Sequence, residues 1–282
     1  MNKFEKEFNI SDMCRVFEVS RSGYYEWLKR PLSNHDREEI ELIKPAVREV
    51  FRESRQSYGC VRISRALIMK SIPISAKRAA RIMREESLIP KAARRFKLTT
   101  DSSHNKTAAP DLVNRNFTSD APGKLWTSDF TAIKTGEGWL YLVAFLDVCT
   151  RMVVGWATGA MMTESLLINA FNKAFSKCNP QPNMIAHSDK GGQYFGKLFR
   201  SILRLFNIQQ SMGTTGDCYD NAITESLWNT IKTECFFDYI PVTRVEAHQM
   251  LFDYIETFYN PKRLHSSIGY MSPEKYVMSM KT

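Results

Sequence analysis

The run LWTSDFTAIKTGEGWLYLVAFLDVCTRMVVGWAT, residues 125–158, decides the fold of this chain. It contains three segments rich in aromatic and β-branched residues, at 125–133, 139–148 and 152–158. Such segments favour β-strands, and the turns between them are short and include Gly136 and Gly138. Because short turns join antiparallel neighbours, the run predicts a three-stranded antiparallel unit.

Downstream of residue 158, helical and strand patterns alternate. The sequence predicts helices at 163–174, 193–206 and 221–235, and short strands at 183–187 and 208–211. Thr163 is the expected N-cap of the first of these helices. Three antiparallel strands followed by alternating helices and strands indicate an α/β fold, with helices on the faces of a mixed sheet.

The residues before the sheet have a helical period instead. Short helices are predicted at 12–17 and 21–29, with Ser20 as the N-cap of the second, and this pair fits a small helix-turn-helix or a plain helical hairpin equally well. Further helices are predicted at 36–54, 61–69 and 76–86, with Ser75 as the N-cap of the last. We divide the chain where the period changes, into a helix-turn-helix-like segment (1–35), a basic helical DNA-binding domain (36–97), a linker (98–121), an α/β core (122–238) and a C-terminal extension of the core (239–282).

The positive charge of the chain is concentrated in one block. The 282 residues carry 39 Lys and Arg against 30 Asp and Glu, a net charge of +9. Residues 51–100 hold 13 basic and 3 acidic residues, whereas residues 120–282 are neutral, with 15 of each. A charge run can be a solvated helix face, but a basic helical block interleaved with apolar residues is typical of nucleic-acid binding. The candidate DNA contacts in the block are Arg62, Arg65, Lys77, Arg78, Arg81, Arg84, Arg94 and Arg95.

Composition argues against several protein classes. The chain is 43 % hydrophobic and 12 % aromatic, which is too much for a wholly disordered protein, and no stretch approaches the roughly 18 apolar residues of a membrane span. The first nine residues lack the apolar core of a signal peptide. The six cysteines form no C-x-x-C pair and the five histidines are dispersed, so free thiols are favoured and no zinc motif is visible. We therefore expect a soluble cytoplasmic protein.

Four acidic residues lie where an ordinary surface carboxylate is not expected. Asp129 interrupts the first strand, Asp189 follows the strand at 183–187, Glu225 lies one turn into the last helix, and Asp147 is near the end of the second strand. A buried carboxylate needs a partner or a metal, and ligands gather at the carboxyl ends of strands in open sheets. Asp129, Asp189 and Glu225 could therefore converge on two Mg²⁺ ions. Asp147 better fits a structural role, in which it bonds a neighbouring arginine or the turn amides.

The helix that carries Glu225 offers a second clue. Lys232 lies seven residues after Glu225, so both side chains project from nearly the same face, and Asn229 lies between them. A glutamate and a lysine on one face can be a structural pair. On a helix that lines a phosphate-processing site, Lys232 would instead reach a DNA phosphate.

Five motifs, in one order along the chain, resemble a known family. They are WTSDFT at 126–131, GWLYL at 138–142, HSDKGGQY at 187–194, YDNAITESLWNTIKTE at 219–234 and YNPKRLHSSIGYMSP at 259–273. With the 35 residues that separate Asp189 from Glu225, they resemble the OrfB-type transposases of bacterial insertion sequences. That family has a ribonuclease H-like catalytic core related to retroviral integrases.

The resemblance implies a fold and a site. The fold would be a ribonuclease H-like mixed five-stranded sheet flanked by helices, preceded by an all-α helix-turn-helix-like DNA-binding region. Asp129, Asp189 and Glu225 would be the catalytic and metal-binding D-D-E triad, holding two Mg²⁺ ions that Mn²⁺ can replace. Lys232 would contact the terminal DNA phosphates.

The resemblance also implies a reaction and partners. The reaction would be nicking at the element ends followed by strand transfer into target DNA, which is DNA transposition and integration. The implied partners are the terminal inverted repeats, the target DNA, at least one further copy of the chain, and an upstream OrfA product or an OrfA–OrfB fusion. The implied location is the bacterial cytoplasm, at the nucleoid.

Several residues keep two interpretations. His187 fits a satisfied strand-end histidine better than a hydrogen bond that orients Asp189, and Asn229 has at most a supporting role beside the triad. Arg263 and His265 either contact DNA or brace the C-terminal segment.

More than one interpretation also fits the tryptophans and the overall function. Trp126 and Trp139 fit a hydrophobic core better than base stacking. For Trp228 the sequence does not favour either role, because its helix faces the site. Two other functions fit the sequence, a non-catalytic DNA-binding regulator and a metal-dependent nuclease that cuts without joining.

Overall fold

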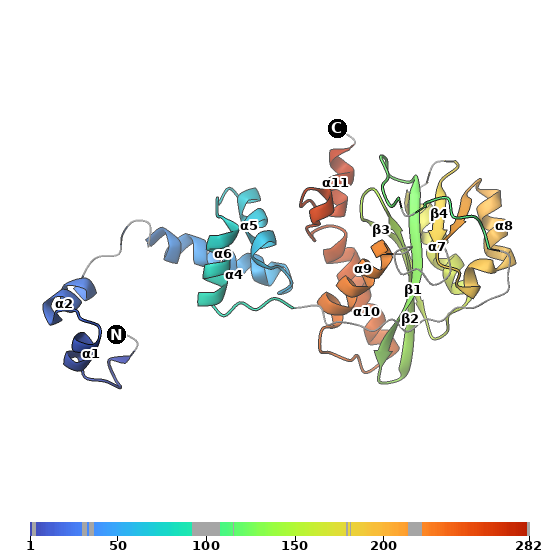
Figure 1. The fold of residues 1–282 in the computed structure, drawn as a ribbon. Helices are drawn as coiled ribbons and strands as arrows, with labels where there is room; N and C mark the ends of the chain where they lie inside the picture. The colour runs from blue at the N-terminus through green and yellow to red at the C-terminus, as the bar shows by residue number, and fades with distance from the viewer. Residues whose placement is uncertain are drawn as a thin grey trace.

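One five-stranded sheet organises the C-terminal part of the chain in the computed structural model (Figure 1). The structure describes residues 1, 4–29, 33, 37–91, 108–114, 116–178, 180, 182–213 and 222–280. The strands are β1 (Leu125–Thr135), β2 (Gly138–Asp147), β3 (Val153–Gly159), β4 (Ile185–Ser188) and β5 (Gln209–Met212). Their order is β3-β2-β1-β4-β5, with β1, β2 and β3 antiparallel and with β4 and β5 parallel to β1. The predicted mixed five-stranded sheet is confirmed.

The hairpin between β1 and β2 is anchored at a glycine turn. The Gly136 N–H donates to the Pro241 carbonyl at 2.9 Å, and a Cβ on Gly136 would lie 2.6 Å from the Val242 carbonyl oxygen. Only glycine allows this close approach of two backbones. Trp139, just after the turn, is 52 % exposed, so its expected place in the core is wrong, whereas Trp126 is fully buried.

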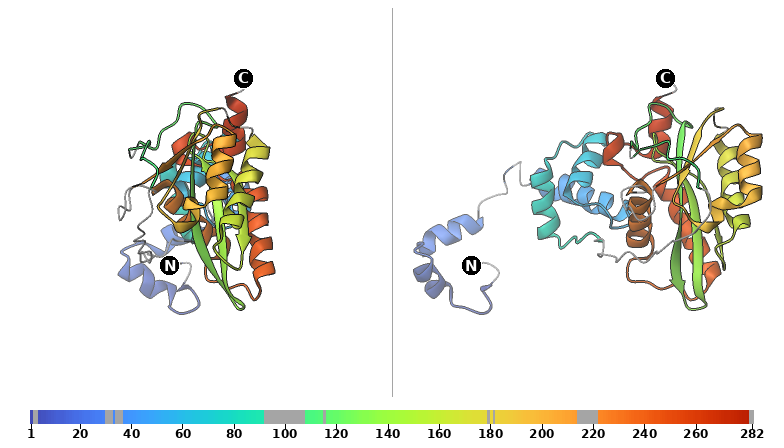
Figure 2. Two further views of the ribbon diagram at one scale, coloured as in Figure 1. Left: turned by 90° about the vertical axis from the view of Figure 1, so that its right-hand side faces the viewer. Right: turned by 45° about the vertical axis from the view of Figure 1, so that its right-hand side comes forward.

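Helices cover both faces of the sheet. Successive side chains of β2 point to opposite faces and are apolar on both, so each face packs in its own hydrophobic cluster. Val143 and Phe145 pack with α7 (Glu164–Cys178) and α8 (Lys197–Leu205), and Leu142 packs with α9 (Ala222–Ile231) and α10 (Arg244–Tyr254) on the other side. Figures 1 and 2 show α7 and α8 on one face and α9 and α10 on the other. No helix in the described residues is long and apolar enough to cross a membrane.

The N-terminal region is entirely helical in its described part. Its elements are α1 (Ile10–Val16), α2 (Arg21–Lys29), the π-helical turn η2 (Glu39–Ile43), α4 (Lys44–Glu53), α5 (Cys60–Met69) and α6 (Ala76–Glu85). The predicted caps are confirmed, because the Ser20 hydroxyl accepts from the Gly23 N–H at 3.0 Å and the Ser75 hydroxyl accepts from the Arg78 N–H at 3.1 Å.

Three predicted helices are divided in the structure. The helix expected at 36–54 contains η2 before α4, and the helix expected at 221–235 ends in the π-helical turn η5 (Lys232–Phe236) after α9. Gly196 is extended, with a ψ of 139°, so the helix expected at 193–206 becomes the 3₁₀ turn η3 (Gly192–Phe195) and then α8. Single π turns inside helices are frequent at functional sites.

Some predictions lie outside the described residues. These are the candidate DNA contacts Arg94 and Arg95, residues 98–107 and 115 of the linker, and the expected first residue of the last helix, Asn221.

The C-terminal segment joins the N-terminal helices to the sheet. It contains η6 (Ile255–Tyr259), η7 (Ser266–Ile268) and α11 (Pro273–Ser279). Arg55 Nη1 donates to Asp253 Oδ2 at 2.6 Å, and the Leu264 N–H donates to the Tyr58 hydroxyl at 2.7 Å. These contacts dock the turn between α4 and α5 on the end of α10 and on the C-terminal segment.

A buried ion pair holds this segment against the end of the α9–η5 helix. Arg263 Nη2 donates to Glu234 Oε1 at 2.6 Å, and Arg263 Nε donates to Glu234 Oε2 at 2.8 Å. The Tyr254 hydroxyl donates to the same carboxylate at 2.7 Å. Arg263 is 4 % exposed, so it braces the C-terminal segment and does not offer its guanidinium to DNA, which corrects its assignment as a DNA contact. His265 lies beside it, within 3.3 Å of Arg263 Nη1, and is also largely buried.

Replacing Arg263 by alanine leaves the Glu234 carboxylate buried without its counter-charge. We therefore expect Arg263→Ala to lower the free energy of unfolding by about 3–5 kcal/mol, as measured by equilibrium urea unfolding. Arg84→Ala, which removes an exposed arginine of α6, is the control and is expected to stay within about 0.5 kcal/mol. A loss of less than about 1 kcal/mol for Arg263→Ala would contradict the role given to the pair.

Candidate active site

Asp129 lies in the middle of the sheet, on β1, opposite Ala144 of β2. Both of its carboxylate oxygens are hydrogen-bonded. Oδ1 accepts from the Phe130 N–H at 2.7 Å, and Oδ2 accepts from Trp228 Nε1 of α9 at 3.0 Å. The strand and the helix therefore orient this carboxylate together.

Asp189 follows directly from the end of β4. Ser188 of β4 pairs with Ser128 of β1 in parallel register, so the two aspartates come next on neighbouring parallel strands. Asp189 Oδ1 accepts from the Gly191 N–H at 3.0 Å, and a Cβ on Gly191 would lie only 3.0 Å from that oxygen. The glycine lets the carboxylate fold back over its own loop.

Glu225 and Lys232 come to the same place on α9 and η5. The Thr224 hydroxyl donates to the Thr127 hydroxyl at 3.0 Å, and this buried contact seats the first turn of α9 on β1. Lys232 begins the π-helical turn that continues α9, and it lies close enough to Asp129 for the carboxylate charge to favour its ammonium form.

The electrostatics connect these four groups. Burial raises the pKa of Asp129 from 3.8 to about 7, and the charges of Asp189 and Glu225 contribute to the rise. Burial also raises the pKa of Asp189 and that of Glu225, and it lowers the pKa of Lys232. When neighbouring carboxyl groups are unfavourable to ionise together, a cation between them stabilises their charged forms.

The donor set suits a hard divalent cation. Asp129, Asp189 and Glu225 offer only carboxylate oxygens, the ligands that Mg²⁺ and Mn²⁺ prefer. Among the residues that the structure describes, no three His, Cys, Asp or Glu side chains already stand at metal-binding distances from one another. The residues that would hold an ion are thus of the right chemical type, and Asp129 lies within electrostatic range of the other two carboxylates.

Two further residues at the site were not identified from the sequence. The Tyr194 and Ser128 hydroxyls are 2.9 Å apart in the interior. The charges of Asp129 and Asp189 both contribute to the raised pKa of Tyr194, although burial is its main cause. Both residues lie inside the quoted motifs, but only the packing shows that they lie beneath the two aspartates.

The remaining candidates separate into structural and exposed residues. His187 Nδ1 bonds the Ser211 hydroxyl of β5 at 2.9 Å, which supports a satisfied strand histidine, and Asn229 is exposed. Asp147 is structural, as favoured from the sequence. Its Oδ1 accepts from the Thr150 N–H at 2.8 Å and its Oδ2 accepts from the Gly123 N–H at 2.7 Å.

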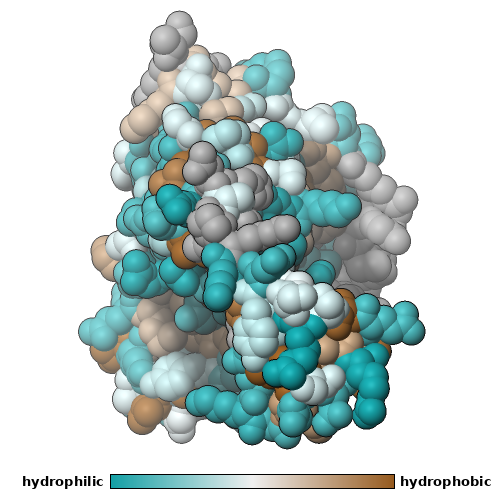
Figure 3. Space-filling view, turned by 90° about the vertical axis from the view of Figure 1, so that its left-hand side faces the viewer, coloured by the Kyte–Doolittle hydropathy of each residue, from teal (hydrophilic) through white to brown (hydrophobic). Residues whose placement is uncertain are grey.

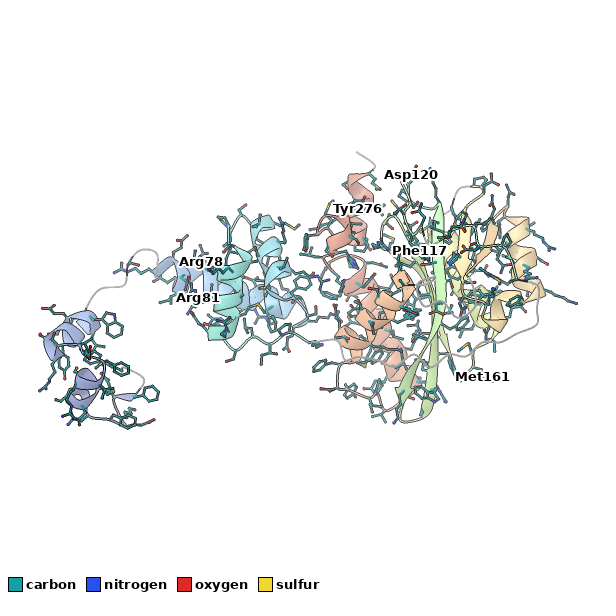
Figure 4. All side chains as sticks on the ribbon, in the orientation of Figure 1. Arg78, Arg81, Phe117, Asp120, Met161 and Tyr276 are labelled. Atoms are coloured by element: carbon teal, nitrogen blue, oxygen red, sulfur yellow. The ribbon has the colours of Figure 1, made fainter. Side chains whose placement is uncertain are left out.

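The predicted DNA contacts on α6 divide into two groups. Arg78 and Arg81 lie next to each other (Figure 4) and both bond the buried Glu39 of η2, with Arg81 Nη2 at 2.6 Å from Glu39 Oε2. Mainly through Arg81, these bonds lower the pKa of Glu39 to about 2. Lys77 and Arg84 are exposed on the same helix.

The two predicted DNA contacts on α5, Arg62 and Arg65, both lie against tyrosine rings, and the ring beside Arg65 belongs to the C-terminal segment. Arg62 lies 5.8 Å from the Tyr58 ring centroid and is half-buried, whereas Arg65 is exposed and lies 5.2 Å from the Tyr270 ring centroid. Hydrophilic residues cover most of the face of the molecule that carries the N-terminal helices (Figure 3).

Comparisons with known proteins find matches for three parts of the chain. Residues 119–218 and 206–273 each match a family model described as an integrase core domain, and residues 36–96 match a model described as an HTH-like domain.

Two relatives match almost the whole chain. The insertion element IS600 uncharacterized 31 kDa protein of Shigella sonnei is 39 % identical over 268 residues, which cover 94 % of this chain and 98 % of the relative. Transposase InsF for insertion sequence IS3A of Escherichia coli (strain K12) is 34 % identical over 277 residues, which cover 98 % of this chain and 96 % of the relative. Among solved structures, the HTLV-2 integrase catalytic core domain in complex with magnesium (trimeric form) matches with a TM-score of 0.45 and 16 % identity, over 56 % of this chain and 99 % of that one.

Divalent ions should stabilise the folded protein through the carboxylates. The raised pKa of Asp129 means that the stability this group contributes is present below pH 3.8 and is lost as the pH rises through about 7, because the ionised form is disfavoured in the fold. We therefore expect saturating Mg²⁺ or Mn²⁺ to raise Tm by a few degrees at pH 8 and by much less at pH 5, as measured by differential scanning calorimetry.

Two variants complete this test. Asp129→Asn should remove most of the metal-induced rise, whereas Asp120→Asn, which alters an exposed aspartate, should keep it. An equal rise in Asp129→Asn and the unaltered protein would place the ion elsewhere.

Proposed function

The chain belongs to the insertion-sequence transposases that carry an integrase core domain, and from this we propose that it nicks and joins DNA by phosphoryl transfer at Asp129, Asp189 and Glu225. The observation that carries the proposal is electrostatic proximity. The three carboxylates come from two neighbouring parallel strands and one helix, and Asp129 lies close enough to the other two and to Lys232 for their charges to interact. No ordinary structural role requires three like charges in one place.

Each residue has a defined part in this chemistry. Asp129, Asp189 and Glu225 would hold two Mg²⁺ ions, which stabilise the attacking and leaving oxygens of the transfer. Trp228 and the Phe130 N–H keep Asp129 turned toward the site. Lys232 would bind a phosphate of the DNA end, because its ammonium lies on the same helix face as Glu225.

The sequence of steps uses the same groups twice. Water first attacks a phosphodiester at the element end, which frees a 3′-hydroxyl. That hydroxyl then attacks a second phosphodiester in line, and the oxygen of the broken P–O bond leaves with a proton. Positioning and charge stabilisation are sufficient for this reaction, since no covalent intermediate with the protein is needed.

The N-terminal helices would hold the element end. Lys77 and Arg84 are exposed on α6, and the family match over 36–96 is to an HTH-like domain. Pairing two ends requires at least two copies of the chain, and an OrfA product or an OrfA–OrfB fusion is a further expected partner.

The triad is tested by removing single negative charges. We expect Asp129→Asn, Asp189→Asn and Glu225→Gln each to reduce nicking and joining of labelled element-end DNA in Mg²⁺ by at least about a thousandfold, because the ions lose a ligand. Binding to the same DNA in a gel-shift assay should stay within about threefold, since the changes do not alter the basic region.

Asp120→Asn is the matched control and should remain active. Near-full activity of any triad variant would show that the site is wrongly assigned. With the unaltered protein, binding without nicking would identify a regulator, and nicking without joined product would identify a nuclease.

The DNA grip of α6 is tested at its two exposed cations. We expect Lys77→Ala/Arg84→Ala to weaken binding of element-end DNA and to make the slope of log K against log salt shallower by about two, because two phosphate contacts are lost. Lys134→Ala/Lys275→Ala removes the same charge from exposed positions of the core and its extension, and it should leave the slope unchanged. Equal slopes for both variants would contradict the proposed role of α6.

A further inference from the structure

A second basic region lies within the neutral half of the chain, on α8 and the loop before it. Residues 190–216 contain four basic residues, at positions 190, 197, 200 and 204, and no acidic residue. Since residues 120–282 as a whole are neutral, this stretch is a local concentration of positive charge.

The basic residues of α8 lie on one side of the helix. Phe199 and Leu203 are buried in the hydrophobic cluster under the sheet. Lys197, Arg200 and Arg204 are spaced by three and four residues, so they share a face, on which Lys197 and Arg204 are exposed. We call these three residues the α8 surface.

The α8 surface borders a hollow of about 300 Å³. Arg200 and Arg204 line it together with Gln210 of β5 and with Ala108 and Ala109 of the segment beside them. The hollow thus has two arginines at the edge of the sheet, and guanidinium groups are well suited to hold phosphate oxygens.

The cations of the α8 surface differ from those of α6. Arg78 and Arg81 are already engaged by Glu39, whereas neither Lys197 nor Arg204 forms an ion pair with any residue that the structure describes. Their charge is therefore available to a polyanion.

The α8 surface is also connected to the catalytic loop. α8 begins eight residues after Asp189, and η3 lies between them. Gln210 Nε2 donates to the Tyr194 carbonyl at 2.8 Å, and the Tyr194 hydroxyl bonds Ser128, the neighbour of Asp129. A phosphate chain on α8 would thus lie beside the elements that carry two of the three carboxylates.

The position of α8 separates it from the N-terminal helices. Figures 1 and 2 place α7 and α8 on the face of the sheet opposite to α4, α5 and α6. Strand transfer needs two DNA segments at one active site. A single chain thus presents basic helices on both sides of its carboxylates.

We propose, resting on the function proposed above, that the α8 surface binds the phosphate backbone of the second DNA duplex, the one that receives the transferred strand. Arg204 lies seven positions after Lys197, so their Cα atoms are about 10 Å apart along the helix, a length over which one DNA strand carries about three phosphates. Backbone contacts of this kind position a duplex without reading its sequence, which suits a DNA partner that differs from one insertion to the next.

The test compares two steps of one reaction. Lys197→Ala/Arg204→Ala is measured for nicking of element-end DNA and for transfer of pre-nicked ends into an unrelated duplex, both in Mg²⁺. We expect nicking within about twofold of the unaltered protein, and transfer reduced about tenfold at physiological salt with a shallower dependence on salt. Lys134→Ala/Lys275→Ala, with the same loss of charge, should keep both steps.

Three results decide the proposal. Unchanged transfer with an unchanged salt dependence overturns it, and so does an equal loss of nicking and transfer, which would assign the α8 surface to the element end. If the unaltered protein neither nicks nor joins, the function proposed above fails first, and binding of the unrelated duplex then tests the surface alone. In that case, equal salt slopes for the α8 variant and the unaltered protein overturn the proposal. Thermal unfolding of every variant must match the unaltered protein, which excludes loss of fold as the cause.

Discussion

Glu234 and Arg263 bring opposite full charges into the interior, and each depends on the other to stay there. Glu234 lies two residues after Lys232 in the turn that ends the α9 helix, and Arg263 lies in the C-terminal segment. The N-terminal helical region packs against this part of the chain, through the Leu264–Tyr58 and Arg55–Asp253 hydrogen bonds. One buried pair therefore ties the helix that carries Glu225 to the C-terminal segment. Because that segment also contacts the N-terminal helical region, the pair helps to position the basic helices beside the core.

The site itself sets a second constraint, which is repulsion. Asp129, Asp189 and Glu225 are held near one another by the parallel register of β1 and β4 and by the seating of α9 on β1. Burial makes the ionised form of each carboxylate unfavourable, and the charges of Asp189 and Glu225 add to this effect in raising the pKa of Asp129. A fold that keeps such a cluster gives up some stability, which is the cost expected of the cation-binding site proposed above.

Much of the fold and of the candidate site was predictable from local patterns. The strands at 125–158 and the caps at Ser20 and Ser75 depend on residue types and spacing within a few positions, and the structure confirms them. Asp129 was identified because an acidic residue in an apolar strand stands out in the sequence. Asp189 and Glu225 were joined to it by their places after a strand and in a helix and by the family resemblance, and the roles of all three remain predictions. Trp139 shows the limit, because an aromatic residue after a turn faces solvent or core depending on what packs over it.

The sequence by itself determined which segments are strands and helices, where the basic charge is concentrated, and which acidic residues are unusual, since these follow from local period and composition. Only the tertiary structure decided the partners. It paired Arg263 with Glu234 instead of leaving it for DNA, engaged Arg78 and Arg81 with Glu39, and set Tyr194 beneath the aspartates. A side chain's partner depends on residues far away along the chain. Burial decides whether its charge is paired inside the fold or stays available at the surface.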